Sequence, residues 1–546
     1  MTPVPIPASA KPLGLYLKAL LALDEGDEDS AVDALQDAVE ADPTSPLLRQ
    51  RLAGLYVRRG MLVEALEQCQ ATLAIQPDDP EARLLMADVL SALNRPGEAI
   101  TEYETVLTID PENQKAQLLL GILYSEQGQL DRASSTLEKL THRNPGSFLA
   151  YYYLGRVHAA AKKYDDAIKA YNQALHLNPQ SEPVLIDLAL VYEAQQKTDE
   201  AIEVYERVLK INPQRAPVRM HLGGLYVGRN KLDDALQQFR ELEKMEADPQ
   251  ETRTKIGLIL LDKGEYERAA TEFSLVLGAE PKNDKVRYYL ASVYAEEKAY
   301  DRAVEEFRRV PPDHEWYVDS RLRVAYIFQQ QERLDDALKE VDEALKVKQD
   351  DEQLLSYQAL LYREQKRMDA AIKILRQLVD RYPDNDKYRF RLGAMYDENG
   401  QRDQSIVQMQ RTIELNPRNS AALNYLGYTY ADQGVRLDEA EQLIRRALEI
   451  DPNDGYFIDS LGWVYYQRGQ YDLAVEELER AAEIVGDDVT VDEHLGDAYL
   501  KVGRITDALR TYRDALNAAK EKDQVERLRA KIDALQRSAR GDEEKL

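Results

Sequence analysis

The sequence predicts an all-α solenoid of about fifteen helix hairpins, and two independent regularities lead to this prediction. Prolines occur at positions 43, 77, 111, 145, 179 and 213, so each follows the previous one by 34 residues. Twelve residues before each of these prolines lies an alanine, and the alanine series continues at the same interval up to Ala371. A repeat of this length holds one supersecondary unit, and such units stack because none can bury its apolar face alone.

The alanine series also fixes the register of the array. Position 405 carries Ser405, and the series resumes at Ala440, Ala474 and Ala508. Every interval is 34 residues except the one from 405 to 440, which places one inserted residue near Gly434–Arg436. Counting each repeat from residue 12 gives an array over residues 12–521, in which position 8 is always Gly or Ala and position 11 is Tyr in ten repeats.

Each repeat is expected to fold as two short helices. Small residues at positions 8 and 20 let the two helices approach closely, since a larger side chain would overpack the contact. Apolar positions 4, 7, 8 and 11 share one helical face, and positions 20, 24 and 27 share another. The proline near position 32 cannot continue a helix and therefore ends the second one.

Outside the array, residues 1–11 are predicted to be a flexible tail, residues 522–538 a capping helix, and residues 539–546 a charged tail. Val525, Leu528, Ile532 and Leu535 provide the helical spacing of the cap. Two irregularities interrupt the array, near residue 249 and at residues 311–318, where Pro311 and Pro312 should end a second helix early. We interpret both as tolerated variation in a turn, and a hinge is the alternative.

The repeat resembles the tetratricopeptide repeat (TPR) family, whose signature includes Leu at position 7, Gly at 8, Tyr at 11, a small residue at 20 and Pro at 32. The resemblance covers residues 12 to about 521. It implies a right-handed superhelix in which the first helices line a concave groove. It also implies binding of proteins or peptides, without chemistry of the array's own.

Composition excludes or disfavours several other classes of function. The formal net charge of −27 disfavours binding to nucleic acids and to anionic lipid surfaces. No stretch approaches the roughly 18 apolar residues of a transmembrane helix. The single cysteine, Cys69, cannot form an intramolecular disulfide, and its place at position 24 predicts a small core residue.

No pattern in the sequence indicates an enzyme, a metal site or a cofactor. The six histidines are scattered, and no HExxH motif or Cys/His spacing is present. Asp492, Glu493, His494 and Asp497 are close enough in sequence to suggest a metal site, but we expect them to be solvated charges that line the groove. We therefore predict no catalytic residue, no metal and no cofactor.

Tyrosine is the residue type that best indicates a binding surface, with 33 Tyr against 7 Phe. Many occupy position 11 and belong to the core, whereas positions 2, 5, 6, 9 and 12 of first helices face the groove in TPR arrays. Tyr and Trp combine a large apolar contact with a polar group and dominate binding hot spots. Partial burial against neighbouring helices is the alternative. Candidate partner-binding residues are Tyr288, Tyr289, Arg323, Tyr326, Tyr357, Phe390, Arg391, Tyr425, Tyr428, Tyr456, Trp463 and Tyr466.

Residues 424–432, 458–466 and 493–499 resemble the end of a group of bacterial cell-envelope TPR proteins, many of them lipoproteins and some of them protease adaptors. The resemblance implies a periplasmic or outer-membrane setting. The start of the chain shows neither a signal peptide nor a lipobox cysteine, so a leader that has been cut away is one alternative and a cytoplasmic assembly factor the other.

We therefore predict a non-enzymatic scaffold or adaptor that binds protein or peptide partners in its groove. It should bind no nucleic acid and have no transmembrane span, with a membrane tether only if a native lipobox has been removed. The alternative is a regulatory subunit that controls a protease, export enzyme or glycosyltransferase through its outer surface.

Overall fold

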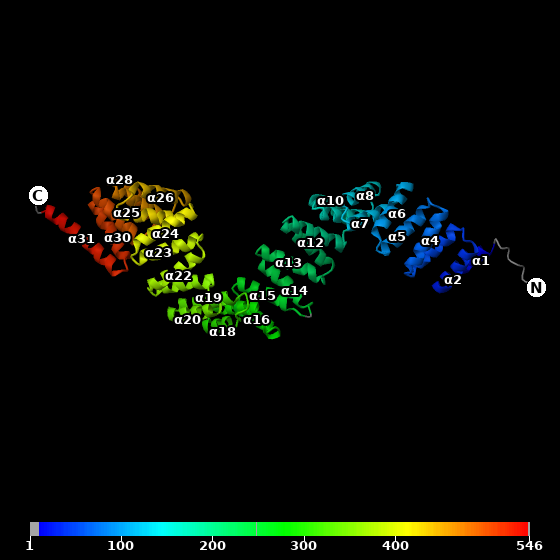
Figure 1. Cartoon of the computed structure of the whole chain (residues 1–546), viewed down its shortest axis with the longest axis horizontal. Helices are drawn as coiled ribbons and strands as arrows, with labels where there is room; N and C mark the ends of the chain where they lie inside the picture. Colours follow the sequence, from blue (N-terminus) through cyan, green and yellow to red (C-terminus); the bar gives the residue numbers. More distant parts are fainter. Residues whose placement is uncertain (1–9, 247, 544–546) are drawn as a thin grey trace, which may run out of the picture. The chain divides into compact units, whose positions relative to one another are not determined.

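The computed structural model describes residues 10–246 and 248–543, and the chain divides into two compact halves, one up to Lys263 and the other from Gly264 onward. Within the described residues all regular structure is α-helical (Figure 1). The helices of the N-terminal half are α1 (Lys11–Asp24), α2 (Glu28–Ala41), α3 (Pro46–Arg58), α4 (Leu62–Ile75), α5 (Pro80–Ala92), α6 (Pro96–Ile109), α7 (Gln114–Glu126), α8 (Leu130–Arg143), α9 (Phe148–Ala160), α10 (Tyr164–Leu177), α11 (Glu182–Ala194), α12 (Thr198–Ile211), α13 (Ala216–Gly228), α14 (Leu232–Glu243) and α15 (Gln250–Asp262).

The C-terminal half continues the same alternation of first and second helices, followed by one final helix. Its helices are α16 (Tyr266–Ala279), α17 (Asp284–Glu296), α18 (Tyr300–Arg308), α19 (Tyr317–Gln330), α20 (Leu334–Val347), α21 (Glu352–Glu364), α22 (Met368–Arg381), α23 (Asp386–Glu398), α24 (Arg402–Leu415), α25 (Ser420–Asp432), α26 (Leu437–Ile450), α27 (Gly455–Gln467), α28 (Tyr471–Val485), α29 (Val489–Lys501), α30 (Ile505–Ala518) and α31 (Lys522–Glu543).

The predicted hairpin is confirmed. The two helices of a repeat pack against each other, as α3 does against α4, and the second helix also packs against the first helix of the next repeat, as α4 does against α5. The two helices of a repeat approach each other most closely at position 8. A Cβ atom added to Gly155 would lie 2.5 Å from the ring of Tyr171, and one added to Gly462 would lie 2.6 Å from Leu478 Cγ.

The turn inside the hairpin begins in the same way in all fifteen repeats, and the repeat with the inserted residue adds a second left-handed residue, Arg436, with φ of 49°. Position 15 has a positive φ in every repeat, with Gly60 at 73° and Asn94 at 57° as examples. In the second repeat the Gly60 amide donates to the Val57 carbonyl at 3.0 Å and the Met61 amide donates to the Tyr56 carbonyl at 2.9 Å. These two bonds form a Schellman motif, which ends the first helix and reverses the chain.

Two side-chain ladders join successive repeats. In several repeats the tyrosine hydroxyl at position 11 bonds to position 25 of the preceding repeat, as in the 2.7 Å bonds from Tyr226 to Glu206 and from Tyr499 to Glu479. At position 4, an arginine binds the carbonyl of the proline that ended the preceding repeat, and Arg219 donates to the Pro213 carbonyl at 3.1 Å. The tyrosine and the proline of the repeat signature therefore have roles in stacking as well as in the single hairpin.

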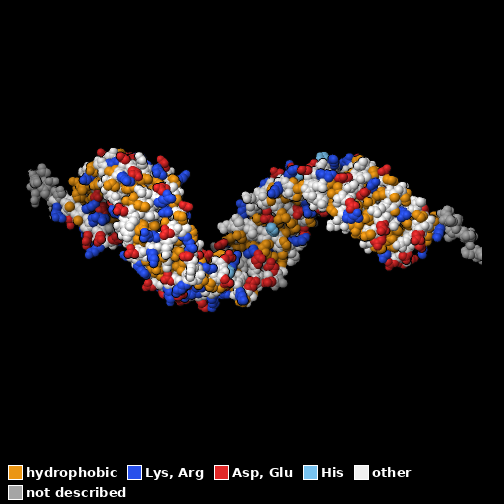
Figure 2. All heavy atoms as spheres, in the orientation of Figure 1, with side chains coloured by type: hydrophobic (Ala, Val, Ile, Leu, Met, Phe, Trp, Pro, Cys, Tyr) orange, Lys and Arg blue, Asp and Glu red, His pale blue; other side chains and the backbone are white. Residues whose placement is uncertain are grey.

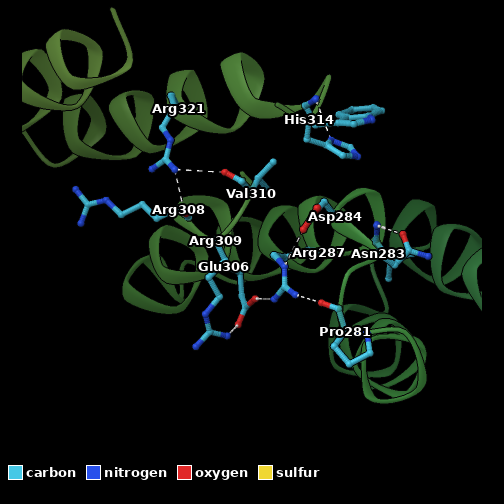
Figure 3. Close-up of polar contacts among 12 residues, drawn as sticks. Pro281, Asn283, Asp284, Arg287, Glu306, Arg308, Arg309, Val310, His314 and Arg321 are labelled. Atoms are coloured by element: carbon cyan, nitrogen blue, oxygen red, sulfur yellow. Dashed lines mark hydrogen bonds and ion pairs between the residues drawn. The ribbon is translucent and has the colours of Figure 1, made fainter. Parts of the chain in front are cut away.

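The irregular stretch at 311–318 changes this ladder (Figure 3). Arg287 keeps the regular pattern, since it donates to the Pro281 carbonyl and, at 2.9 Å, to Glu306. The second helix of that repeat, α18, ends at Arg308, ahead of Pro311 and Pro312. With no proline carbonyl at the usual position, Arg321 instead donates to the carbonyl of Arg308 at 2.7 Å.

The ends of the array differ in part from expectation. The cap, α31, extends to Glu543 rather than to 538, because the predicted charged tail contains no proline and the lone Gly541 weakens a helix without ending it. The predicted N-terminal tail lies mostly outside the described residues, since α1 begins at Lys11. None of the helices described has the length and hydropathy that a membrane span requires.

Candidate functional site

All twelve candidate binding residues lie in the C-terminal half, and all lie on first helices. The structure does not gather them into one site. They fall into a group around a cavity, a group beside the turn at 311–318, a group near the C-terminal end, and isolated side chains. Their helices are α17 (Tyr288, Tyr289), α19 (Arg323, Tyr326), α21 (Tyr357), α23 (Phe390, Arg391), α25 (Tyr425, Tyr428) and α27 (Tyr456, Trp463, Tyr466).

A cavity of about 770 Å³ lies between α19, α21 and α23 and brings Tyr357, Phe390 and Arg391 together. Leu322 and Phe390 each lie 34 residues from Ser356, so the three occupy position 5 of successive repeats. The short Ser356 between two larger side chains leaves space for the hollow. The other lining residues are Gln353, Ala359, Leu360, Arg363, Leu375, Tyr388, Ala394, Met395 and Glu398.

The two arginines of the cavity differ in their partners. Arg363 is paired with Glu398, with nitrogen–oxygen distances of 2.9 and 2.7 Å, so its charge is neutralised locally. Arg391 donates at 2.6 Å to the hydroxyl of Ser356, and no carboxylate among the described residues lies within 4 Å of it. An exposed guanidinium beside an apolar cavity is suited to a carboxylate ligand, which it can bind through two parallel hydrogen bonds.

Tyr357 forms one wall of the cavity and is held by a chain of hydrogen bonds. Its hydroxyl donates to the Gln329 side chain, which in turn donates to Glu364 at 2.5 Å. Burial, followed by the negative charge of Glu364, raises the pKa of Tyr357 above its usual value. The ring is therefore fixed and neutral, and it offers an apolar surface rather than an ionisable group.

The second group lies beside the turn at 311–318, and here the sequence prediction was partly wrong. Tyr288 is 9% exposed and belongs to the core, because Trp316 covers it with a ring-centroid distance of 4.6 Å. Tyr289 lies against Phe273 at 5.8 Å. Arg323 does not reach the cavity residues but donates to the Tyr288 hydroxyl at 3.4 Å, and this hydrogen bond raises the pKa of Arg323. The sequence prediction missed Trp316, which the early end of α18 brings back over α17.

The third group is an aromatic stack at the C-terminal end. Trp463 lies between Tyr466, at 4.6 Å and 5° between ring planes, and His494, at 4.0 Å and 16°. Tyr428 lies 6.1 Å from the same histidine. The indole nitrogen of Trp463 is buried and has no hydrogen-bond partner among the described residues. Trp463 and Tyr466 are half-buried against the C-terminal core, which corresponds to the alternative interpretation of the tyrosine pattern.

The acidic segment of α29 is not a set of solvated groove charges, and that expectation was wrong. Glu493 and His494 are each 7% exposed. His494 Nδ1 lies 2.9 Å from Asp459, and Glu493 binds Arg527 at 2.7 Å and Lys531 at 2.8 Å from α31. Burial alone would raise the pKa of Glu493, but these two cations more than offset burial and hold it below its usual range. The segment therefore fastens the cap to the last repeat.

The three remaining candidate residues and the single cysteine differ in how far they are exposed. Tyr326 and Tyr456 are 48% and 55% exposed, and Tyr326 is near enough to the cavity residue Tyr357 to raise its pKa, whereas Tyr425 is half-buried against the C-terminal core. Cys69 is buried, as predicted for a core residue, and burial raises the pKa of its thiol to about 12. The cavity residues Leu322 and Leu360 were missed because only aromatic and arginine side chains were sought. Apolar residues at positions 5 and 9 of first helices would have indicated them.

Three family models described as tetratricopeptide repeat match the chain, the first at residues 22–89, 193–252 and 260–315, the second at 418–545 and the third at 323–386. The chain is a tetratricopeptide repeat protein. A fourth model, the C-terminal ARM domain of tetratricopeptide repeat protein 21, matches residues 62–222. Proteins of the tetratricopeptide repeat family generally serve as non-enzymatic scaffolds that bind proteins or peptides.

Solved structures similar to this tetratricopeptide repeat protein include one from Parabacteroides merdae, 22% identical over 46% of this chain and 99% of its own, with a TM-score of 0.35. MamA is 29% identical over 29% of this chain and 94% of its own, with a TM-score of 0.29. YrrB, described as a TPR protein with an unusual peptide-binding site, is 18% identical over 37% of this chain and all of its own, with a TM-score of 0.32. No curated protein sequence matches significantly.

Proposed function

We propose that this protein is a non-enzymatic scaffold that binds a segment of another protein in the cavity between α19, α21 and α23. The cavity itself is the observation that supports the proposal. It combines apolar walls from Leu322, Leu360 and Phe390 with the guanidinium of Arg391, which has no carboxylate partner among the described residues. A concave, mostly apolar site with a few placed polar groups is the usual form of a ligand-binding site.

The lining residues define the chemistry of the proposed ligand. An apolar side chain would fill the space between Leu322 and Phe390, and a carboxylate next to it would bind Arg391. That carboxylate belongs either to an acidic residue or to the end of a chain. Over the face of the molecule that Figure 2 shows, charged side chains of both signs are interspersed with apolar ones. The apolar walls of the cavity and the charge of Arg391 therefore favour the cavity as the binding site for this ligand.

A library of random peptides displayed on phage, selected against the intact chain, tests the proposal. We expect enriched peptides to share an apolar residue next to a carboxylate and to bind the Arg391→Ala variant at least tenfold more weakly. Arg376→Ala is the matched control, because Arg376 is an exposed arginine on the second helix α22. Enriched peptides without a carboxylate, or equal binding to the Arg391→Ala variant, would contradict the proposal.

One observation supports the alternative of a regulatory subunit that binds through its outer surface. A second hollow, of about 790 Å³, lies on α16, α17 and α18, where the short side chains of Ala270, Thr271 and Ser274 leave space beside Tyr294. A photo-crosslinking residue placed at Leu275 in this hollow, or at Leu360 in the cavity, separates the two ideas. The proposed scaffold should crosslink its selected peptide from position 360 alone.

We further propose a bacterial cell-envelope setting, which rests on the resemblance of residues 424–432, 458–466 and 493–499 to envelope TPR proteins. Fractionation of the native organism, followed by immunoblotting of the periplasmic, membrane and cytoplasmic fractions, tests this setting. Recovery in the cytoplasmic fraction alone would contradict it and favour an assembly factor.

A further inference from the structure

The hollow of about 790 Å³ on α16, α17 and α18 keeps two hydrogen-bond donors of the repeat pattern but lacks their acceptor. Its lining includes Ser274, at position 25 of one repeat, and Tyr294 and Arg302, at positions 11 and 19 of the next repeat. In several other repeats position 25 holds the acceptor for the position-11 tyrosine, as Glu206 does for Tyr226. The repeats in which these positions are filled therefore show what the hollow lacks.

The equivalent positions five repeats earlier carry Glu104, Tyr124 and Arg132. The Tyr124 hydroxyl and the Arg132 guanidinium both donate to the Glu104 carboxylate, and the guanidinium also lies 4.2 Å from the centre of the Tyr124 ring. One carboxylate thus accepts from a tyrosine and neutralises an arginine at the same time. Charge-assisted hydrogen bonds of this kind are stronger than neutral ones.

The last repeat builds the same arrangement with an arginine from a different position. Glu479, at position 25, accepts from the Tyr499 hydroxyl at 2.7 Å and from Arg504 at 2.8 Å. The Arg504 guanidinium lies 4.2 Å from the centre of the Tyr499 ring. A glutamate between a tyrosine and an arginine is therefore a recurrent unit of this array.

In the hollow the tyrosine and the arginine adopt this arrangement without the glutamate. Arg302 lies 3.9 Å from the centre of the Tyr294 ring and donates to the Tyr294 hydroxyl at 2.6 Å. Among the described residues the proton of this hydroxyl has no acceptor, and no carboxylate lies within 4 Å of Arg302. Ser274 donates to the Ala270 carbonyl at 2.7 Å instead. An unused donor on a residue that is only 6% exposed carries a desolvation cost, which a carboxylate ligand would remove.

We propose that this hollow is a second binding site of the protein and receives a glutamate side chain of a partner protein. The carboxylate would lie where Glu104 lies in the filled repeat and would accept from Tyr294 and Arg302. The volume of about 790 Å³ is far larger than a carboxylate needs, so a segment of a protein chain fits it better than a free organic acid. The site goes beyond the cavity of the proposed function and does not depend on it.

The rim of the hollow indicates which residues accompany the glutamate. Glu267 and Glu297 line the hollow, and neither has a cation within 4 Å among the described residues. The equivalent residues of the filled repeat are Gly97 and Gln127, so that repeat lacks these two charges. They would repel a run of acidic residues, whereas a glutamate with Lys or Arg nearby would pair with both signs of charge. The expected ligand therefore has mixed charge, unlike the apolar residue and carboxylate expected at the cavity.

Supplying the glutamate from the chain itself tests the geometry without a partner. Ser274→Glu restores the residue type of the filled repeat, and Ser274→Gln is the matched control of the same length without the charge. We expect the amides of α17 and α18 to exchange hydrogen at least threefold more slowly in the Ser274→Glu variant than in the Ser274→Gln variant. The difference should disappear when Arg302→Gln is added. Equal exchange with Arg302 in place would show that the hollow cannot hold a carboxylate between its two donors, and would overturn the proposal.

A peptide selection tests binding. A phage-displayed library is selected on the intact Arg391→Ala chain, in which the cavity is disabled, and is counter-selected on the same chain carrying Ser274→Glu. We expect enriched peptides to share a glutamate with Lys or Arg within four residues, and to bind more weakly as salt is raised. In fluorescence anisotropy with a labelled peptide, Tyr294→Phe and Arg302→Gln should each weaken binding at least tenfold. Arg132→Gln is the matched control and should have no effect, because the carboxylate at that site is already present.

Three results of the selection would overturn the proposal: no peptide that survives the counter-selection, surviving peptides without a carboxylate, or equal binding of a peptide whose glutamate is replaced by glutamine. Displacement of the peptide by an equal concentration of free glutamate would identify a small acid as the occupant instead. Binding should be the same to the parent chain and to the Arg391→Ala variant, so this site and the cavity succeed or fail separately.

Discussion

The two ends of the repeat array differ in how far their apolar side chains are covered. At the start, α1 leaves Leu21 and its neighbouring leucines exposed, and a Cβ atom added to Gly14 would meet nothing within 4 Å. At the end, α31 covers the last hairpin, and Leu528 and Ile532 are 0% and 7% exposed. Arg527 and Lys531 of α31 add ion pairs to Glu493 of α29.

This difference shows that an interior repeat and a terminal repeat bury their apolar residues in different ways. Interior repeats bury their apolar positions against neighbours that carry the same pattern, so the pattern alone is sufficient. An end has no such neighbour and needs a helix with one apolar face and one polar face. The chain supplies that helix at its C-terminal end, whereas none of the described residues covers Leu21 of α1 in the same way.

The largest expected contrast comes from the same substitution at the two ends. Leu528→Ala removes a fully buried side chain and should destabilise the C-terminal hairpins by about 2–5 kcal/mol. Leu21→Ala removes a side chain that is mostly in water and should change stability by less than about 0.5 kcal/mol. Hydrogen exchange of the amides in α29 and α30, and in α1 and α2, measures the two effects separately. Comparable losses at both ends would show that α1 is covered in solution.

Replacing a helical glycine by alanine should change the stability in opposite directions at the two ends. A Cβ atom on Gly496 would lie 2.5 Å from the ring of Tyr512, so Gly496→Ala forces that ring to move and should cost about 1–3 kcal/mol. Gly14 lies in a helix with open space around it, so Gly14→Ala should stabilise α1 by up to about 1 kcal/mol. The melting of each end, followed by hydrogen exchange, gives the sign. Destabilisation by Gly14→Ala would mean that another group occupies this space.

The repeat fold could be predicted from the sequence because its causes are local and recur fifteen times. Gly or Ala at position 8 and the alanine series at position 20 follow directly from a close helix contact, and the structure shows that contact at Gly427, where an added Cβ atom would lie 2.9 Å from the carbonyl oxygen of Ala440. The position-15 turn was harder to predict, since residues such as Asn94 and Lys162 adopt the same left-handed conformation as glycine. At position 15 the hydrogen bonds of the turn impose the left-handed conformation, and residues other than glycine adopt it as well.

The candidate site could be predicted only in part, because its shape depends on contacts between repeats. Tyr357 and Arg391 both occupy position 6 and line one cavity, yet position alone did not reveal that Trp316 would bury Tyr288. The burial of Glu493 was also missed, because it depends on a helix outside the repeat pattern. Periodicity predicts which side of a helix a residue occupies, but the covering of that side depends on residues elsewhere in the chain.

A third contrast concerns pH. Burial, followed by the charges of Asp514, Asp487 and Asp488, raises the pKa of Asp492 to about 6. An unfolded aspartate titrates near 3.9, so the folded state binds the proton more tightly and gains stability as the pH falls from about 6 to about 4. Asp492→Asn should therefore stabilise the C-terminal end at pH 7 by roughly 1–2 kcal/mol, with the gain vanishing below about pH 4.

The first repeat is the control for this titration, because it carries Leu15 at the position of Asp492. Thermal melts of the parent chain and the Asp492→Asn variant between pH 4 and pH 8, followed by the fluorescence of Trp463 in a Trp316→Phe background, measure the effect. A gain that is independent of pH would show that the pKa of Asp492 is the same in the folded and unfolded states, so that burial does not raise it.

The smallest expected effect should be equal at the two ends. Gly26 and Gly503 occupy position 15 of the first and the last repeat, with φ of 76° and 79°, and a Cβ atom at either would meet nothing within 4 Å. Alanine at each therefore meets only the backbone cost of the left-handed conformation, about 1 kcal/mol. Hydrogen exchange of each hairpin should report the same loss for Gly26→Ala and Gly503→Ala. Because the turn is made entirely within one repeat, a cost that differed between the ends by more than about 0.5 kcal/mol would show that covering an end also changes the hairpin beneath it.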